Sequence, residues 1–173
     1  IAPDLTATYL LPPPESIFKT PHDIPFPYGR PPVPTKDGFF AVTQYGMLLH
    51  YSYRDKKWTD ESHQFPDQLR NTYQELRAAT APGKRFDYAP PTIGFINDTL
   101  YIGTAADGHT IGRVVHGKYE LIASSRRQPA EHPVDEVSPS NVAALFPGTN
   151  GRPYALLNLS DRSEVYDLEL GKK

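Results

Sequence analysis

Six histidines are the side chains of this chain best suited to catalysis or metal binding, because an imidazole titrates near neutral pH and is the commonest metal ligand. They are His22, His50, His63, His109, His116 and His132. No two of them have the HxH, HxxxH or HExxH spacing that brings two ligands to one metal ion. We therefore predict no metal site, and we expect no cofactor.

Three of the histidines have predicted positions that argue against catalysis. His50 lies within a predicted strand, which indicates a partly buried imidazole held by hydrogen bonds, and His109 and His116 adjoin predicted turns. A rival hypothesis stays open, in which the chain is a hydrolase or lyase, or part of one. Its site would combine one of these three histidines with Asp98 or Asp107 at one end of the fold.

Other catalytic patterns are absent from the sequence. There is no GxSxG nucleophile turn and no GxxxxGK[ST] or GxGxxG phosphate loop. The chain contains no cysteine, which excludes disulfides, thiolate metal ligands and a cysteine nucleophile. Gly148–Arg152 is rich in glycine but joins two predicted strands, so we interpret it as a turn and not as an anion site. We predict no catalytic residue and favour a protein that is not an enzyme.

Tyrosine is the residue type that most favours a binding function. The chain has eleven tyrosines and a single tryptophan, and tyrosine combines a large contact area with a polar group at interfaces. Several tyrosines lie in or beside predicted turns, where core packing does not require them. Together with arginines in exposed segments they give the predicted binding residues, which are Tyr28, Arg30, Tyr45, Tyr53, Arg70, Arg77, Tyr88, Arg126 and Arg127. The alternative is that these tyrosines only reflect the preference of tyrosine for strands.

The charge balance and the hydropathy narrow the class of partner. Eighteen Lys and Arg residues against twenty Asp and Glu residues give a net charge of −2, so no positive field attracts a nucleic acid. No apolar run approaches the roughly 20 residues that a membrane-spanning helix needs. We therefore expect another protein as the partner, with the oligomeric state left open. The Ile at position 1 would suit a chain trimmed after an export signal, and we expect a periplasmic or secreted location.

Repeated hairpins must position these residues. Gly38–Trp58, Thr99–Ile122 and Pro153–Leu170 each read as strand, tight polar turn and strand. In the second unit the predicted turns are Asp107-Gly108, a strong hairpin signal, and Gly117-Lys118. In the third, the return strand is expected to run through Tyr166, Leu168 and Leu170, which alternate with acidic residues. The sequence therefore predicts a mainly β fold of repeated antiparallel hairpins.

The second hairpin has the residues that carry a resemblance to known proteins. Asp98–Thr104 followed by Gly108–Tyr119 resembles a blade of the β-propeller families of the kelch and quinoprotein type, and Lys57-Trp58 stands where such blades often have an aromatic residue. The resemblance implies a propeller-like stack of sheets. Propellers have at least four blades, whereas three units are recognisable here.

Three architectures are compatible with this count. One is a small propeller whose fourth blade uses a strand at Leu5–Leu10. Another is an open or sandwich-like stack of sheets. The third is a partial propeller that is completed by another chain or by further sequence.

Two segments depart from the hairpin pattern. Leu11–Pro34 is so rich in proline that neither a helix nor a central strand is expected, and we interpret residues 1–36 as a strap on the domain. Pro66–Ala79 has Leu69, Tyr73 and Leu76 at helical spacing and predicts one short amphipathic helix. We expect a single β domain over 1–173, with a strap at 1–36, hairpins at 37–62, 90–123 and 141–173, a helix at 66–81 and a polar loop at 124–140.

These observations favour a β module without catalytic activity that binds another protein through its loops. Its most concrete version is an exported inhibitor or immunity-type protein.

Overall fold

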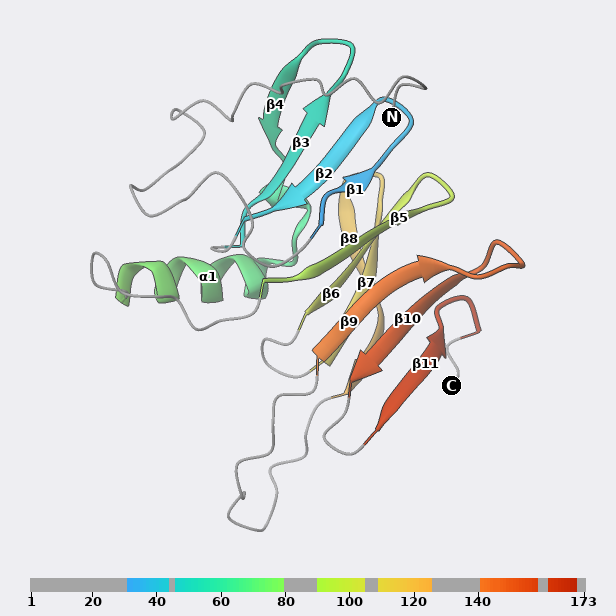
Figure 1. Ribbon diagram of the computed structural model, residues 1–173. Helices are drawn as coiled ribbons and strands as arrows, with labels where there is room; N and C mark the ends of the chain where they lie inside the picture. The colour runs from blue at the N-terminus through green and yellow to red at the C-terminus, as the bar shows by residue number, and fades with distance from the viewer. Residues whose placement is uncertain are drawn as a thin grey trace.

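The computed structural model describes residues 31–43, 46–79, 90–104, 109–125, 141–158 and 162–170. In these ranges the chain forms three antiparallel sheets and one α-helix (Figure 1). The sheets do not close into a barrel. The prediction of a mainly β fold with one short helix is therefore confirmed, whereas residues 1–30 of the proline-rich segment and the predicted strand at Leu5–Leu10 lie outside the described residues.

Sheet A follows the first predicted hairpin and adds an edge strand to it. Its strands, in the order β1-β2-β3-β4, are β1 (Val33–Pro34), β2 (Gly38–Val42), β3 (Leu48–Ser52) and β4 (Lys57–Asp60). Every residue of β2 is buried, which is typical of a strand covered on both faces. Pro34 lies in the edge strand β1, where a residue without an N–H is tolerated.

Sheet B is a four-stranded meander. Its strands, in the order β5-β6-β7-β8, are β5 (Thr92–Ile96), β6 (Thr99–Thr104), β7 (His109–Val115) and β8 (Lys118–Ser125). Positive φ angles at Asn97 and Asp98, and again at His116 and Gly117, form the two-residue turns that match the twist of a hairpin. The turn predicted at Gly117-Lys118 is thus centred one residue earlier. The turn predicted at Asp107-Gly108 lies outside the described residues.

Sheet C has three described strands. They are β9 (Asn141–Pro147), β10 (Pro153–Asn158) and β11 (Ser163–Asp167), in the order β11-β10-β9. The prediction that the last strand continues to Leu170 is wrong, because β11 ends at Asp167. The Asp167 carboxylate accepts hydrogen bonds from the backbone N–H groups of Glu169 and Leu170, each at 3.0 Å, and so turns the chain away from the sheet.

The three sheets stack face to face in the order A, B, C. Between A and B, the core contains Phe40, Val42 and Leu48 of sheet A and Ile93, Leu100 and Ile102 of sheet B. Between B and C, it contains Ile96, Tyr101 and Ile111 of sheet B and Val142, Ala155 and Leu168 of the sheet C segment. Sheet B is therefore the central layer, and each of its faces is buried.

Helix α1 (Asp67–Ala79) closes one end of the core between sheets A and B. Leu69 and Tyr73 pack there with Phe65. A Cβ on Gly46 would lie 2.4 Å from the Tyr73 ring, and the φ of Gly46 is +73°, so this position requires glycine. Within the described ranges, no helix has the length and apolar character needed to span a bilayer.

Two glycines set the distance between sheets B and C. A Cβ on Gly103 of β6 would lie 2.6 Å from Cγ1 of Val142, and a Cβ on Gly94 of β5 would lie 2.6 Å from Cβ of Leu145. Both partners belong to β9. The missing side chains let β9 approach the backbone of β5 and β6 more closely than a larger residue would allow.

The first turns of the three sheets lie in series at one end of the stack. Lys36, in the β1–β2 turn, forms an ion pair of 2.6 Å with Asp98 in the β5–β6 turn. Asn97 of that same turn donates a hydrogen bond of 2.8 Å to the carbonyl oxygen of Gly151 in the β9–β10 turn. The first strands β1, β5 and β9 are also neighbours in this order. Each sheet thus repeats the placement of the preceding one.

Replacing Gly103 with Ala tests the close approach of β9. We expect a loss of about 1–3 kcal/mol in the free energy of unfolding, because the added methyl group meets the branched Val142 side chain inside a packed core. Urea denaturation followed by circular dichroism measures this loss. The control is Leu121→Thr on β8, where the side chain is 59% exposed, and a change within about 0.5 kcal/mol is expected. Equal stability of G103A and the parent chain would contradict the packing described here.

Candidate functional site

The histidines do not assemble a catalytic or metal site in the part of the chain that the structure describes. The ring of His50 packs on Phe40 with 4.7 Å between ring centroids, and His63 is an exposed side chain 3.8 Å from Glu61. His116 lies in the exposed β7–β8 turn. No three His, Asp or Glu side chains of the described ranges come together where they could hold a metal ion.

The remaining histidines cannot be placed in a site. His22 and His132 lie outside the described residues, and only the backbone of His109 is described, in β7.

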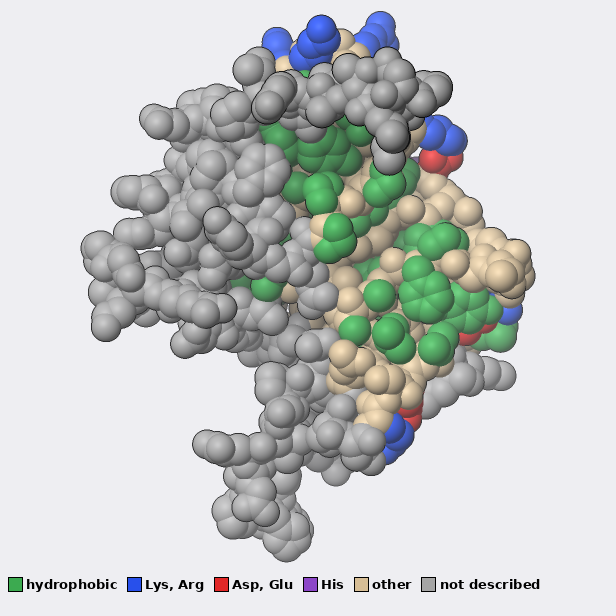
Figure 2. Space-filling model, viewed as in Figure 1, with side chains coloured by type: hydrophobic (Ala, Val, Ile, Leu, Met, Phe, Trp, Pro, Cys, Tyr) green, Lys and Arg blue, Asp and Glu red, His purple; other side chains and the backbone are tan. Residues whose placement is uncertain are grey.

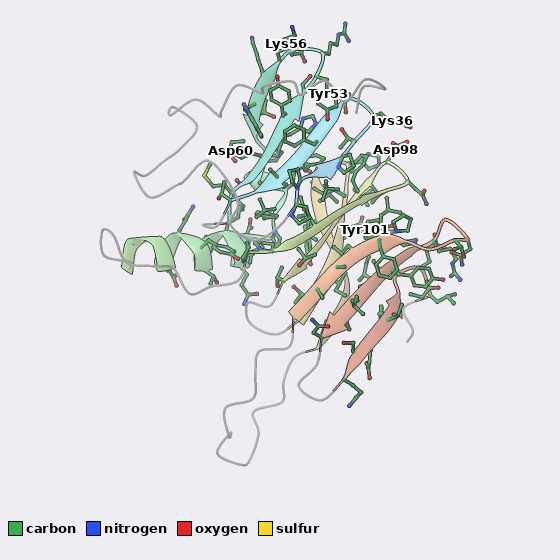
Figure 3. All side chains as sticks on the ribbon, in the orientation of Figure 1. Lys36, Tyr53, Lys56, Asp60, Asp98 and Tyr101 are labelled. Carbon is green, nitrogen blue, oxygen red and sulfur yellow. The ribbon has the colours of Figure 1, made fainter. Side chains whose placement is uncertain are left out.

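Two of the predicted binding residues have described side chains, and they do not form one site. Tyr53 lies at the β3–β4 turn near Lys56 (Figure 3), where its side chain is 53% exposed. Arg70 lies on α1 and pairs with Asp67 of the same helix. Figure 1 shows α1 beside the opposite end of sheet A from the β3–β4 turn. Arg77 also belongs to α1, but its side chain is not among those described.

The other predicted binding residues lie outside the described ranges. They are Tyr28, Arg30, Tyr45, Tyr88, Arg126 and Arg127.

A candidate binding surface other than the predicted loops is the outer face of sheet C, which faces away from sheet B. Strand pairing places Phe146 beside Tyr154 in one row, and Ala144, Leu156 and Val165 in the next. These five residues define the outer face of sheet C. Four are partly exposed and Val165 is 50% exposed. Figure 2 shows hydrophobic side chains gathered on the side of the molecule where Figure 1 places β9 to β11.

A β-bulge in the pairing of β9 with β10 determines which side chains of β9 lie on the outer face and which lie on the buried face. The register of β9 against β10 shifts between Leu156 and Leu157. Because of the shift, Val142 and Leu145 of β9 both point toward sheet B although they are three residues apart. Ala144 and Phe146 are thereby directed to the outer face.

The aromatic pair on this face is held by the β9–β10 turn. Phe146 and Tyr154 stack with 6.1 Å between ring centroids and 26° between ring planes. Tyr154 lies over Gly148, where a Cβ would come within 2.4 Å of the ring, and its hydroxyl accepts a hydrogen bond of 3.1 Å from Nδ2 of Asn150. The ring therefore has a fixed position before any partner binds.

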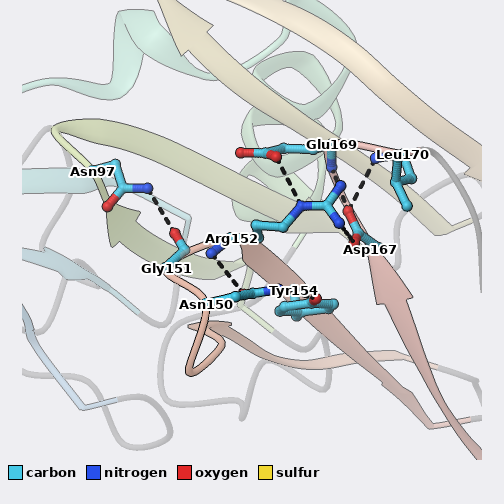
Figure 4. A network of polar contacts seen from close by, with 8 residues as sticks. All are labelled: Asn97, Asn150, Gly151, Arg152, Tyr154, Asp167, Glu169 and Leu170. Carbon is cyan, nitrogen blue, oxygen red and sulfur yellow. Dashed lines mark hydrogen bonds and ion pairs between the residues drawn. The ribbon is translucent and has the colours of Figure 1, made fainter.

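An ion-pair cluster borders one end of the face (Figure 4). Nη1 of Arg152 lies 3.0 Å from Oδ2 of Asp167, and Nε of Arg152 lies 2.9 Å from Oε2 of Glu169. The pKa of Asp167 is lowered, first by the hydrogen bond from the Leu170 N–H and further by the Glu169 N–H and the Arg152 charge. The pKa of Arg152 is raised, mainly by its hydrogen bond to Glu169. These directions favour the charged forms of Asp167 and Arg152, which pair with each other.

The opposite end of the face is polar, and an ion pair lies beside it, with 2.7 Å between Nε of Arg162 and Oε1 of Glu164. Oγ of Ser163 donates a hydrogen bond of 3.0 Å to Oδ1 of Asn158. The surface therefore has an apolar centre between two polar borders, which is the anatomy of a protein interface.

An apolar run in the sequence indicates this surface, whereas the sequence-based prediction placed the binding residues in loops. Tyr154, Ala155, Leu156 and Leu157 are consecutive apolar residues, which is typical of a strand covered on both faces. Comparison of the chain with protein-family models, with curated proteins and with solved structures gave no match.

Replacing Asp167 with Asn tests the ion-pair cluster. Because its pKa in the folded protein lies below the ordinary value of 3.8, the carboxylate stabilises the fold above that pH, and the stabilisation is lost as the pH falls through the folded pKa. We expect D167N to unfold at a lower temperature than the parent chain at pH 7. The difference should shrink as the pH falls below 3.8 and through the lowered pKa of Asp167.

Thermal denaturation over this pH range provides the measurement. Glu75→Gln on the exposed side of α1 measures the effect of removing one negative charge elsewhere. A difference in Tm between D167N and the parent chain that is the same at both ends of the pH range would contradict a stabilising carboxylate at Asp167.

Proposed function

We propose that this chain is a protein-binding β module without catalytic activity, built as an incomplete propeller-like stack of sheets, and that the outer face of sheet C is its binding surface. The observation that carries the proposal is the difference between this face and the other sheet faces. The facing surfaces of A and B, and of B and C, bury their apolar residues in cores. The outer face of sheet C has the same chemistry but is open to solvent.

The serial placement of the sheets supports the propeller-like part of the proposal. The blades of a propeller are four-stranded antiparallel sheets that repeat around an axis. Sheets A and B have four strands each, and the first strands and first turns of A, B and C are neighbours in sequence order. A stack of three such sheets has two end faces instead of a closed ring.

Among the described residues, the two end faces differ in how far their apolar side chains reach solvent, although Tyr53 is 53% exposed at the margin of the sheet A face, 6.1 Å from the Phe39 ring. On the end face of sheet A, Phe39, Tyr51 and Trp58 form an aromatic cluster in which each side chain is less than 9% exposed. On the end face of sheet C, the aromatic and aliphatic side chains reach solvent. Contiguous exposed apolar surface of this kind marks interaction sites.

A binding site built from loops has less support in the described residues. Tyr53 is exposed at the β3–β4 turn among the basic side chains of Arg54, Lys56 and Lys57. One aromatic ring on a charged hairpin offers little apolar area, and exposed charges contribute little affinity. An inhibitor or immunity role and an exported location stay predictions from the sequence, and the proposal does not depend on them.

The proposal is tested by affinity purification from the native host with three versions of the chain, namely the parent, Leu156→Glu and Leu121→Glu. A partner that uses the outer face of sheet C should be recovered in a stoichiometric amount with the parent and with L121E, and lost with L156E. With the purified partner, we expect L156E to raise the Kd by about 30-fold or more, because a buried carboxylate replaces an apolar contact at the centre of the surface.

Leu121 is the control because it is the same residue type on a strand, β8 of sheet B, where it is 59% exposed, whereas Leu156 is partly exposed. Circular dichroism confirms that each variant is folded. Equal affinity of L156E and the parent for the partner, or the absence of any stoichiometric partner, would overturn the proposal.

A further inference from the structure

We infer that Asn150 is a site of spontaneous covalent modification, where the side-chain amide is lost through attack by the Gly151 backbone nitrogen, and that the folded β9–β10 turn controls the rate. The inference goes beyond the proposed function and does not depend on it. It is carried by two observations, which are the exposed Asn-Gly pair in this turn and the hydrogen bonds that the reaction must break.

Asn150 and Gly151 form the reactive pair. The chain has five asparagines, which are Asn71, Asn97, Asn141, Asn150 and Asn158. Of these, Asn150 alone precedes a glycine, whose missing side chain leaves its nitrogen free to approach the neighbouring carboxamide carbon. No described atom lies within 4 Å of the place that a Cβ on Gly151 would occupy. Asn150 is also exposed, so water reaches both residues.

The turn explains why these two residues stand together. The φ of Gly151 is +75°, a conformation that favours glycine. Its N–H donates a hydrogen bond of 2.9 Å to the Gly148 carbonyl, and the Gly148 N–H donates one of 2.8 Å to the Arg152 carbonyl. Oδ1 of Asn150 accepts a hydrogen bond of 3.0 Å from the Arg152 N–H, the kind of local bond that favours asparagine in turns. The residues that build the turn are therefore also the residues that react.

The reaction is an intramolecular displacement followed by hydrolysis. The Gly151 nitrogen loses its proton to hydroxide and attacks Cγ of Asn150. The N–Cγ bond forms, the Cγ–Nδ2 bond breaks, and Nδ2 takes a proton from water and leaves as ammonia. Water then opens the cyclic imide at either carbonyl carbon, which gives aspartate or isoaspartate. One water is consumed and one ammonia is released, without oxidation or reduction.

Two hydrogen bonds of the native turn cannot exist in the cyclic imide. The imide nitrogen has no proton, so the bond from Gly151 to the Gly148 carbonyl is lost. Nδ2 of Asn150, which donates a hydrogen bond of 3.1 Å to the Tyr154 hydroxyl, is expelled. A bond of 2.8 Å from Asn97 to the Gly151 carbonyl also ties this turn to the β5–β6 turn (Figure 4). Ring closure therefore requires the turn to open, as exchange of a protected amide proton does.

The first experiment incubates the purified chain at mildly alkaline pH and follows conversion of amide to acid by peptide mass spectrometry. We expect Asn150 to be converted before the other four asparagines. A peptide of residues 146–155, which has no folded turn, should be converted at least about 10-fold faster than the intact chain, because its Gly151 nitrogen is not protected.

The second experiment weakens the turn without changing the reacting pair. Tyr154→Phe removes the hydroxyl that binds Nδ2 of Asn150, and we expect conversion to be about 5-fold faster. Asn97→Gly removes the bond to the Gly151 carbonyl, suits the φ of +51° at this position, and should also accelerate conversion. Exchange of the Gly151 amide proton, measured by NMR, should increase by the same factor in each variant. Tyr53→Phe at the β3–β4 turn is the matched control and should leave both rates unchanged.

The two products should differ in their effect on stability. Isoaspartate adds one carbon to the main chain between Cα of residue 150 and the nitrogen of Gly151, so the hydrogen-bonded turn can no longer close as in the parent. We expect the purified isoaspartate form to unfold at a lower temperature than the Asn150→Asp variant, which has the same charge on an ordinary main chain.

Three results would overturn the inference. One is conversion of another asparagine before Asn150, and another is conversion of the folded chain as fast as the peptide. The third is a rate in both Y154F and N97G equal to that of Y53F, with each variant shown to be folded by circular dichroism. Equal melting temperatures of the isoaspartate form and N150D would contradict the role given to the hydrogen-bonded turn.

Discussion

The contact of β9 with the central sheet is the constraint on which the rest of the structure depends. Gly94 and Gly103 remove the side chains that would keep β9 away, and the hydroxyl of Thr92 donates a hydrogen bond to the carbonyl of Val142 across the same gap. Because Val142 and Leu145 fill the space left by the glycines, the orientation of β9 is fixed. The opposite side chains of β9 and of its neighbour β10 must then face outward, and this creates the outer face of sheet C.

Two edge strands bear charged residues that oppose the pairing of a further strand, whereas the centre of the outer face of sheet C bears none. The exposed edge strand β8 bears Lys118 and Glu120, and β4 bears Lys57. Charged edge residues oppose the addition of a further strand, because their charges would be desolvated or paired with foreign backbone. The centre of the outer face of sheet C has no such charge. The proposed binding therefore uses the face of a sheet and not an edge, and the flanking polar rows limit the extent of the apolar surface.

The local parts of the fold could be predicted from the sequence, and the functional surface could not. The alternation of Leu49 and Tyr51 with His50 indicated β3 and its two faces, and the spacing of Leu69 and Tyr73 indicated α1, because these patterns depend on a few neighbouring residues. Strands β5 and β9 were harder to predict, since Gly94 interrupts the first and the bulge disturbs the alternation in the second. Which face of sheet C is open depends on long-range packing. No local pattern around Leu156 indicates which face of sheet C is exposed.

The ion-pair cluster explains how an apolar face can coexist with charged neighbours. Arg152 satisfies Asp167 and Glu169 within the same chain, so none of these groups needs a partner from another molecule. The lowered pKa of Asp167 keeps its pair with Arg152 intact through mildly acidic conditions. Asn150 donates a hydrogen bond to the Tyr154 hydroxyl, and the Tyr154 ring stacks with Phe146. In the proposed binding, the energy of association would come from the apolar side chains of the face, because the neighbouring charges are already paired within the chain.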